Sequence, residues 1–356
     1  MNFHKKILTG ISFLLLFVVS VFWLMGCSRA TAKDKVTLVN NEKDQKVEVF
    51  VNGKPFTSYI YSDKIDVLKK PVLYPLRTAN GTKITRYYPL EQRAGERVDH
   101  PHHIGFWLNY GNVNGFDFWN NSNAIPPERA PRMGVIRHRA IKSMKNGEQG
   151  ILEIVADWIA GNGKKLLTEN TRFVFSGDKN LRIIDRITTL TALDEKVNFT
   201  DNKEGFVAIR VTRALEHPTD KPIKLSDASG KVTDVPVLDN TGVTGKYYSS
   251  EGKIGTEVWG TRAKWVMLSG IVEGEKVSVA IFDHPDNVGY PTYWHARPYG
   301  LFAANPLGQK IFSKGKEELN FALNPGESVT FKYRVVIRSG ETTPEQMEAL
   351  YNQFVK

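Results

Sequence analysis

Apolar and polar residues alternate with a period of two over much of the chain, the pattern of β-strands that bury one face. It is clear in residues 46–61, where Asn52-Gly53 supplies a pair that favours a tight hairpin turn. Elsewhere Gly, Asn and Asp divide the pattern into short segments, and we expect strands within 150–161, 167–193, 204–215, 276–285 and 327–340. The chain is therefore predicted to be mainly β.

Helical periodicity is confined to the last residues, 342–356. Thr343 can cap a helix, Pro344 suits its first turn, and Gln346 stands where it completes a capping box. A stripe of apolar residues follows at helical spacing and is expected to pack on a sheet: Met347, Leu350, Tyr351 and Phe354. We predict a C-terminal helix that covers part of the β-structure.

Residues 46–356 contain many strand segments and no obvious linker, which favours one all-β domain, a large antiparallel β-sandwich. Two smaller β domains are the alternative. The tripeptide Asp-His-Pro occurs at 99–101 and again at 283–285. Because the flanking residues do not match, we interpret the two copies as convergent geometry or chance rather than as a repeat.

The N-terminus has the features of an export signal. Lys5 and Lys6 precede an apolar run over 7–25, and the run ends in Leu-Met-Gly-Cys at 24–27. We predict a signal peptide at 1–26, lipidation of Cys27 and a polar tether at 27–45. An uncleaved membrane anchor is the alternative, because the run is nearly long enough to span a bilayer. Either places the domain at the cell envelope, in the periplasm or on the outer membrane surface.

Composition narrows the function classes. The 356 residues carry a formal charge of +10, but Lys and Arg are scattered, so nucleic acid is not an expected partner. Cys27 is the only cysteine, which excludes an intrachain disulfide, thiol catalysis and cysteine metal sites. We expect the membrane to be contacted only through the lipid anchor.

The stretch DHPHHIGFWLNYGNVNGFDFW, residues 99–119, places three histidines within four positions. On a strand His100 and His102 would share a face and His103 would point the other way. Pro101 restricts this segment to an edge strand or to a loop that enters one. Asp117 and Trp119 follow two residues apart and would share a face.

Three further stretches concentrate chemically active side chains. Residues 203–210 contain Lys203, Glu204 and Arg210, and residues 259–265 contain Arg262. Residues 283–308 contain His284, Tyr293, Trp294, His295, Arg297 and Asn305. Together these residues would suit a sugar site. Aromatic faces stack on sugar rings, cations bind hydroxyls, and a His–Glu pair can exchange protons.

Other interpretations of the same residues remain open. Two histidines and a carboxylate could bind a metal ion. His103 could be a core imidazole, Asp99 a turn former, and Glu204 the partner of Lys203 in a surface ion pair. The tryptophans could belong to the core.

Four stretches resemble the PmoA-like family of uncharacterised bacterial proteins, and the resemblance covers most of the chain after residue 45. They are residues 99–119, KEGFVAIRV, WGTRAKWV and IFDHPDNVGYPTYWHARPYGLFAANPLG. The family's methane oxygenase label looks like a misnomer, since no apolar span follows residue 26. The resemblance implies a fold similar to the galactose mutarotase-like supersandwich. In such folds His and Glu on a concave sheet perform acid–base chemistry on sugars.

We therefore expect an exported, lipid-anchored carbohydrate-active enzyme, a hydrolase, lyase or epimerase, in which Glu204 is the general acid or base. Its partner would be His100, His102 or His295. Arg210, Arg297, Asp117 and Asn305 would position hydroxyls or a carboxylate, and Trp119, Tyr293 and Trp294 would stack on the sugar. Further substrate contacts are expected from His103, Lys203, Arg262 and His284.

Two alternative functions remain. A glycan-binding surface lipoprotein without catalysis would need the aromatic residues and arginines but not the histidine cluster. A metal-dependent enzyme would use histidines and a carboxylate as ligands. The main hypothesis requires no cofactor, although a bound metal ion is compatible with these residues.

Overall fold

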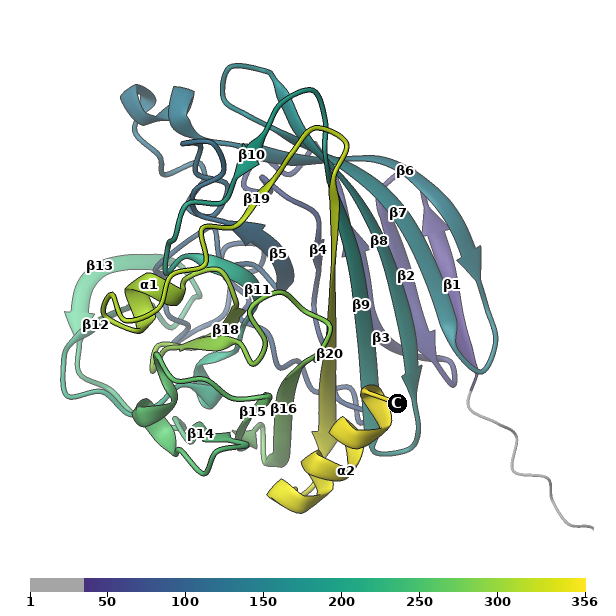
Figure 1. Ribbon diagram of the computed structural model, residues 1–356. Helices are drawn as coiled ribbons and strands as arrows, with labels where there is room; N and C mark the ends of the chain where they lie inside the picture. Colours follow the sequence, from purple (N-terminus) through teal and green to yellow (C-terminus); the bar gives the residue numbers. More distant parts are fainter. Residues whose placement is uncertain (1–34) are drawn as a thin grey trace, which may run out of the picture. The chain divides into compact units, whose positions relative to one another are not determined.

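The computed structural model describes residues 35–356, whose strands form two large antiparallel sheets (Figure 1). The strand order of the first sheet is β1-β2-β3-β4-β5-β11-β18-β17. Its strands are β1 (Val36–Asn41), β2 (Lys46–Val51), β3 (Lys54–Ile60), β4 (Val72–Leu73), β5 (Phe106–Tyr110), β11 (Gly205–Arg210), β18 (Leu301–Asn305) and β17 (Tyr293–Ala296).

The second sheet has the order β14-β15-β16-β20-β9-β8-β7-β6 and contains the longer strands. They are β14 (Lys246–Ser249), β15 (Trp265–Val272), β16 (Glu275–Asp283), β20 (Ser328–Ser339), β9 (Leu181–Ala192), β8 (Lys165–Gly177), β7 (Gly150–Ile159) and β6 (Val135–Lys145). Neighbours along the chain pair directly from β6 through β9, so this part of the sheet is a simple meander.

Short elements complete the described part. Two ribbons pair β10 (Val197–Asn198) with β19 (Ala322–Leu323), and β12 (Ile223–Ser226) with β13 (Val232–Val237). The α-helices are α1 (Gln309–Phe312) and α2 (Pro344–Phe354). Short 3₁₀ segments occur at Pro127–Arg132, Arg213–Leu215 and Gly255–Val258.

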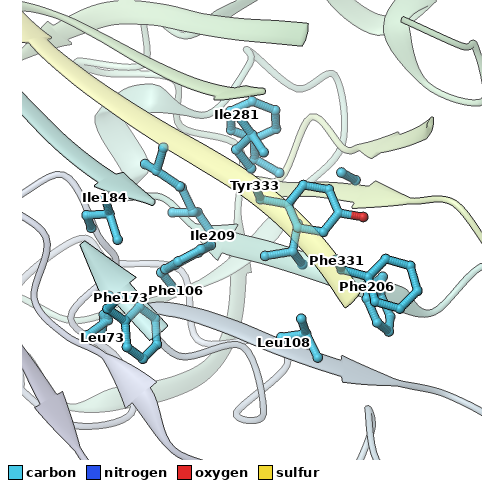
Figure 2. Packing of buried hydrophobic residues seen from close by; sticks show 14 of the residues in the cluster. Leu73, Phe106, Leu108, Phe173, Ile184, Phe206, Ile209, Ile281, Phe331 and Tyr333 are labelled. Carbon is cyan, nitrogen blue, oxygen red and sulfur yellow. The ribbon is translucent and has the colours of Figure 1, made fainter. Parts of the chain in front are cut away.

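The main hydrophobic core lies between the two sheets. Ile209 and Phe206 of β11 belong to the same buried cluster as Phe331 and Tyr333 of β20, and Figure 2 shows side chains of both sheets meeting there. The contacts of residues 35–356 join them into one unit, which disfavours two separate β domains. The predicted large antiparallel sandwich is confirmed, and its two stacked eight-stranded sheets give it a supersandwich architecture.

The C-terminal helix forms as predicted. The Thr343 hydroxyl accepts the backbone N–H of Gln346, while the Gln346 side chain accepts the backbone N–H of Thr343, which completes the capping box. Met347 and Tyr351 are buried against Phe282 and other residues on the outer face of the second sheet. Figure 1 shows α2 beside the end of β20. The helix therefore covers a second, smaller apolar cluster.

The N-terminal part of the sheet agrees in part with the sequence predictions. β2 and β3 form the expected hairpin, with positive φ values of 52° at Asn52 and 73° at Gly53. β1 lies inside the segment predicted to be tether, because Val36 and Leu38 are buried at the edge of the first sheet. The predicted signal peptide at 1–26 and the predicted lipidation site, Cys27, lie outside the described residues.

None of the helices within residues 35–356 is both long enough and apolar enough to cross a membrane.

Candidate functional site

Four side chains form a row across the first sheet, on the face turned away from the second sheet. The register places Ala208 of β11 opposite Trp107 of β5 and opposite Ala303 of β18, and Ala303 opposite His295 of β17. Because successive strand residues point to opposite faces, the intervening residues supply the core between the sheets. The row therefore has two small methyl groups at its centre and a large ring at each end.

The segment before β5 is a turn that brings three imidazoles together. The backbone N–H of His103 donates to the carbonyl of His100 at 3.0 Å, and His100 has a φ of 43°. The centroids of the His100, His102 and His103 rings lie 4.3 to 5.6 Å apart. The predicted strand arrangement, with His103 opposite the other two, is wrong because a turn rather than a pleat sets these orientations.

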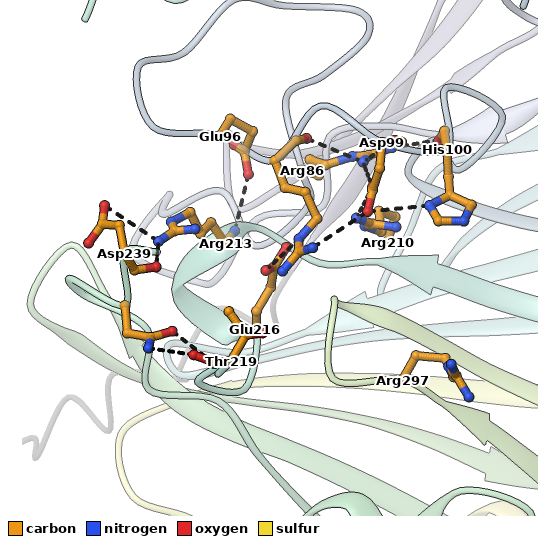
Figure 3. Close-up of polar contacts among 12 residues, drawn as sticks. Arg86, Glu96, Asp99, His100, Arg210, Arg213, Glu216, Thr219, Asp239 and Arg297 are labelled. Atoms are coloured by element: carbon orange, nitrogen blue, oxygen red, sulfur yellow. Dashed lines mark hydrogen bonds and ion pairs between the residues drawn. The ribbon is translucent and has the colours of Figure 1, made fainter. Parts of the chain in front are cut away.

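Asp99 is the electrostatic centre of this turn (Figure 3). Its carboxylate accepts hydrogen bonds from Arg86 at 2.8 Å and from Arg210 at 2.5 Å, and both guanidinium groups are fully buried. Burial raises the pKa of Asp99, but Arg210, His100 and Arg86 outweigh it and hold the pKa well below its usual range. Asp99 is therefore a fixed negative charge that anchors the segment.

His100 is the most accessible imidazole of the cluster. Its side chain is 41% exposed, and its Nδ1 lies 3.3 Å from the Asp99 carboxylate. Its ring stacks on His103 at 4.9 Å and on Tyr299 at 5.1 Å, each with an interplanar angle of 3°. A carboxylate at Nδ1 orients the ring and leaves Nε2 to exchange a proton with a bound molecule.

Glu204 precedes β11 and is held by the backbone around it. Its N–H donates to the Asn202 side chain at 2.9 Å, and its carbonyl accepts the N–H of Gly111 at 2.7 Å. Its side chain is 20% exposed and lies 3.5 Å from Lys203 Nζ. Burial raises the pKa of the Glu204 carboxyl, against the opposing charges of Lys203 and His100. Glu204 can therefore hold a proton at a higher pH than a solvated glutamate.

His295 and Asn305 fix the backbone beside Glu204. His295 Nδ1 lies 2.8 Å from the carbonyl of Lys203, which can only accept, so Nδ1 is the donor. Asn305 donates to the same carbonyl at 3.0 Å and to the carbonyl of Asn202 at 2.8 Å. Burial lowers the pKa of His295 to about 3. The ring is thus neutral near pH 7, with Nε2 unprotonated.

His102 and His103 are buried beneath the exposed ring of His100. Burial lowers the pKa of both well below the usual range, and Lys70, Arg210 and the other histidines lower it further. His103 Nδ1 accepts from Arg210 at 3.1 Å. Within residues 35–356, no hydrogen-bond partner reaches Nε2 of either ring. Both imidazoles are neutral side chains that support the turn, and this position does not favour His102 as a proton donor.

Two predicted substrate contacts lie elsewhere. His284 contacts Phe354 of α2 at 5.2 Å, beside the second sheet. Trp294 points to the inner face of β17, is fully buried in the main core and donates to the carbonyl of Ala263 at 2.9 Å. The predictions for both residues are wrong, because the register of β17 and the docking of α2 place these side chains away from the His100 turn.

Arg262 and Tyr293 belong to a separate network around Glu317. Arg262 binds the Glu317 carboxylate and donates to the carbonyls of Gly289 and Pro291. Tyr293 donates to Glu317 at 2.9 Å. Their polar groups are therefore occupied by the protein itself, and this arrangement does not favour the predicted sugar contacts.

Asp117 and Trp119 also have structural positions. One carboxylate oxygen of Asp117 accepts the backbone N–H groups of Trp119 and Asn120, each at 2.9 Å, so this carboxylate shapes a turn. Trp119 is buried and contacts the rings of His103 and Trp107 from below. The predicted stacking surface at Trp119 is wrong, because the indole supports the histidine turn instead of facing solvent.

Sequence reasoning missed residues that the structure brings to this cluster. Arg86, which binds Asp99, comes from a loop that shows no strand or motif pattern. Tyr299 lies two residues after Arg297 in a segment that was already singled out, and this proximity was the available signal. Trp259 is 40% exposed, and the Arg297 guanidinium carbon lies 5.4 Å from its ring centroid.

A cavity of about 490 Å³ lies beside Arg93, Glu96, Arg213 and Asp239. None of the site residues expected from the sequence lines it. The arginines that line it have acidic partners, since Arg93 pairs with Glu273 at 2.9 Å and Arg213 with Asp239 at 3.6 Å. We therefore assign the chemistry to the His100 turn rather than to this cavity.

The structure provides little for the metal hypothesis. Among the residues from 35 onward, no group of three or more His, Cys, Asp or Glu side chains is arranged to hold a metal ion. His103 already uses Nδ1 to accept from Arg210, and two guanidinium groups surround Asp99. Positive charge at these positions opposes a bound cation.

Comparison with known families corrects the expected relationship. The family model that matches the chain, over residues 46–352, is that of a family of unknown function, DUF6807. The predicted membership of the PmoA-like family is therefore wrong, and the residues quoted for it are those of a different uncharacterised family. No curated protein matches the chain.

Solved structures similar to this fold include three with names from carbohydrate chemistry. The galactosidase domain of an alpha-galactosidase-sucrose kinase has a TM-score of 0.39 and 8% identity, and covers 85% of this chain and 42% of its own. A beta-arabinopyranosidase has a TM-score of 0.28 and 12% identity, and the match covers 86% of this chain and 38% of that protein. A protein of Escherichia coli K12 assigned as an aldose 1-epimerase has a TM-score of 0.28 and 9% identity, and the match covers 86% of this chain and 99% of that protein. At these TM-scores the likeness carries no argument about activity, and this chain spans less than half of the first two proteins.

Proposed function

Because the chain belongs to DUF6807, a family of unknown function, its activity has to be argued from the site, and we propose that it is an enzyme that moves protons on a saccharide. Glu204 is the general acid or base, and His100, oriented by Asp99, is the second proton-transfer group. The reaction class is hydrolysis, elimination or epimerisation. The proposal requires no cofactor.

The observation that carries the proposal is the pairing of a largely buried carboxyl with an oriented, exposed imidazole. Burial raises the pKa of Glu204, the His100 side chain is 41% exposed with the Asp99 carboxylate at its Nδ1, and the charge of His100 acts on the Glu204 carboxyl. Pairs of titratable groups in different environments are typical of acid–base sites. His100 also has a positive φ, a conformation that is uncommon outside glycine and tends to occur at functional positions.

Each remaining group has a defined task in this proposal. Asp99 orients His100, while Arg86 and Arg210 keep Asp99 ionised and in place. His295 and Asn305 hold the Lys203 carbonyl and so fix the backbone that carries Glu204. Because that backbone is anchored on both sides of the carboxylate, Glu204 is preorganised for a bound sugar.

A screen of oligosaccharides read by mass and NMR would test the proposal, with Glu204→Gln as the decisive variant. Removal of a general acid or base is expected to lower turnover about a hundredfold or more, while saccharide binding stays within a few-fold. Glu251→Gln, an exposed glutamate in the turn after β14, is the matched control and is expected to keep full activity.

Two outcomes would contradict the proposal. Wild-type turnover in Glu204→Gln would remove Glu204 from the chemistry. Binding of a saccharide that the wild-type protein never converts would instead identify a glycan-binding protein, the principal alternative expected from the sequence.

A further inference from the structure

The surroundings of His100 contain several buried charges. Two buried guanidinium groups, those of Arg86 and Arg210, share the carboxylate of Asp99, and the charges of Glu96 and Glu216 also act on Arg86. The buried amine of Lys70 lies below the turn and donates to the carbonyl of His102 at 2.7 Å. Arg86 and Arg210 thus have acidic partners within the protein, so a cation that can bind an anionic ligand has to come from another residue of the cluster.

Arg297 adds a cation that the protein does not neutralise. Within residues 35–356 its guanidinium has no hydrogen bond and no ion pair, and its neighbours are the rings of Trp259 at 5.4 Å and Tyr299 at 5.6 Å. Ring contacts hold the plane of a guanidinium while they leave its N–H groups without acceptors. Since Tyr299 also stacks on His100, this cation lies one ring away from the proposed proton-transfer group.

Lys203 lies near the same point. Its side chain is 54% exposed, and its only acidic partner among the described residues is Glu204, at 3.5 Å. The carbonyl of Lys203 accepts from the imidazole of His295 at 2.8 Å, and the charges of Arg297 and Lys203 both act on this imidazole. Lys203 thus carries positive charge beside Glu204, and Arg297 carries it two residues beyond His295.

We propose that the preferred saccharide carries a carboxylate, as a uronic acid does, and that Arg297 and Lys203 bind this group while Trp259 stacks on the neighbouring sugar ring. This inference rests on the proposed function and adds the substrate class. A planar guanidinium fits a carboxylate with two parallel hydrogen bonds. The exposed indole of Trp259, in contact with Arg297, provides the apolar surface that a pyranose ring needs.

Saturation-transfer NMR and calorimetry on the full-length protein would test the inference with matched pairs of sugars. The pairs are D-glucuronate against D-glucose and D-galacturonate against D-galactose, with glucose 6-sulfate as a third anion. The uronates are expected to bind roughly ten- to a hundredfold more tightly than their neutral counterparts, the effect of a charge-assisted hydrogen-bond pair. Raising the salt concentration is expected to weaken only the anionic members.

Arg297→Gln and Lys203→Gln are expected to reduce this preference, with the larger loss in Arg297→Gln, while binding of the neutral sugars changes less than about threefold. Arg172→Gln on β8 of the second sheet is the matched control, an exposed arginine paired with Glu153 at 3.5 Å, and is expected to keep the preference. Trp259→Ala is expected to weaken acidic and neutral sugars alike, because stacking does not depend on charge.

Each other outcome would overturn the inference. A carboxylate-selective site would be excluded if uronates bind no more tightly than neutral sugars, or if neither kind of sugar binds. A preference for the sulfate ester alone would assign the cations to a different anion. An intact preference in Arg297→Gln would place the selectivity elsewhere. If neutral sugars are converted in a Glu204-dependent way, the proposed function stands and only this inference fails.

Discussion

The imidazole of His100 and the phenol ring of Tyr299 are parallel to within 3°, with their centroids 5.1 Å apart. The two residues come from distant parts of the sequence, one before β5 and the other in the turn between β17 and β18. Their contact joins the histidine turn to the segment that carries His295 and Arg297. The candidate site depends on this junction, because neither segment alone provides both the exposed imidazole of His100 and the unpaired guanidinium of Arg297.

Replacing Tyr299 would separate the role of its ring from that of its hydroxyl. Tyr299→Phe keeps the stacking surface and is expected to keep the rate within about twofold. Tyr299→Leu removes the ring that positions His100 and is expected to lower the rate roughly two- to tenfold, the usual value of an aromatic pair. The pH–rate profile should move in Tyr299→Leu only. Equal profiles in both variants would show that Tyr299 does not position His100.

Asp99→Asn is expected to reduce stability at neutral pH. The variant leaves two buried guanidinium groups facing a neutral amide, and since Asp99 is partly exposed we expect a loss of about 2–3 kcal/mol. Urea unfolding would measure it. Asp234→Asn, a pair with Lys224 at the surface, is the control and is expected to change little.

The same variant makes a prediction for acid unfolding. Because the folded-state pKa of Asp99 is depressed, its contribution is fully present above the unfolded pKa, about 3.9, and is lost as pH falls below that value. The wild-type advantage over Asp99→Asn should therefore shrink below about pH 4. A constant difference across this range would mean that Asp99 is not the group that titrates.

The buried amine of Lys70 leads us to expect a second pH dependence of stability, between neutral and alkaline pH. Burial lowers its pKa to about 7, whereas in the unfolded chain the amine titrates near 10.4. Between these values the unfolded chain holds a proton that the folded protein lacks, so stability rises with pH by up to about 1.4 kcal/mol per unit.

Lys70→Met removes this charge while it keeps an unbranched apolar side chain, and should flatten the stability curve between about pH 7 and pH 10. Denaturant unfolding at several pH values would measure the slope. Lys145→Met, at an exposed position of β6, should leave the slope unchanged. Parallel curves for wild type and Lys70→Met would contradict the prediction.

Gly105 joins the histidine turn to β5 and has no room for a side chain. Its φ is 60°, and a Cβ atom would lie 2.2 Å from the Leu73 carbonyl oxygen. Gly105→Ala is expected to cost several kcal/mol, about 3 or more, because strain and overlap combine. Gly115→Ala is the matched control, with a φ of 84° and no neighbour within 4 Å, and is expected to cost about 1 kcal/mol. Comparable thermal unfolding of the two variants would show that the turn can move.

The alternation of residues was sufficient to predict the strands, the hairpin at Asn52-Gly53 and the cap of α2, because each is a local property. The density of histidines, charged and aromatic side chains in a few short stretches selected Glu204, His100 and His295 as candidates, and the charge of His100 acts on both of the others. The strand register cannot be obtained from one sequence, which is why the burial of Trp294 on the inner face of β17 could not be predicted.

The two copies of Asp-His-Pro show the same limit. Asp99 binds Arg86 and Arg210 beside the first sheet, whereas Asp283 ends β16 and accepts hydrogen bonds from Asn287 and Thr292. The two aspartates have the same neighbours within the tripeptide. Only the residues that they contact from distant segments distinguish their roles. Interpreting Asp99 as a turn former therefore missed its main role.

The division of β11 into two faces has an evolutionary consequence. Arg210 serves the histidine turn, while its neighbour Ile209 fills the interior between the sheets. Insertion or deletion of one residue in this short strand would exchange the two, so a guanidinium would enter the apolar core and an isoleucine would face the histidine turn. Substitutions on the outer face of β11 can thus vary independently of the core, whereas a change of length here would disrupt the core and the histidine turn together.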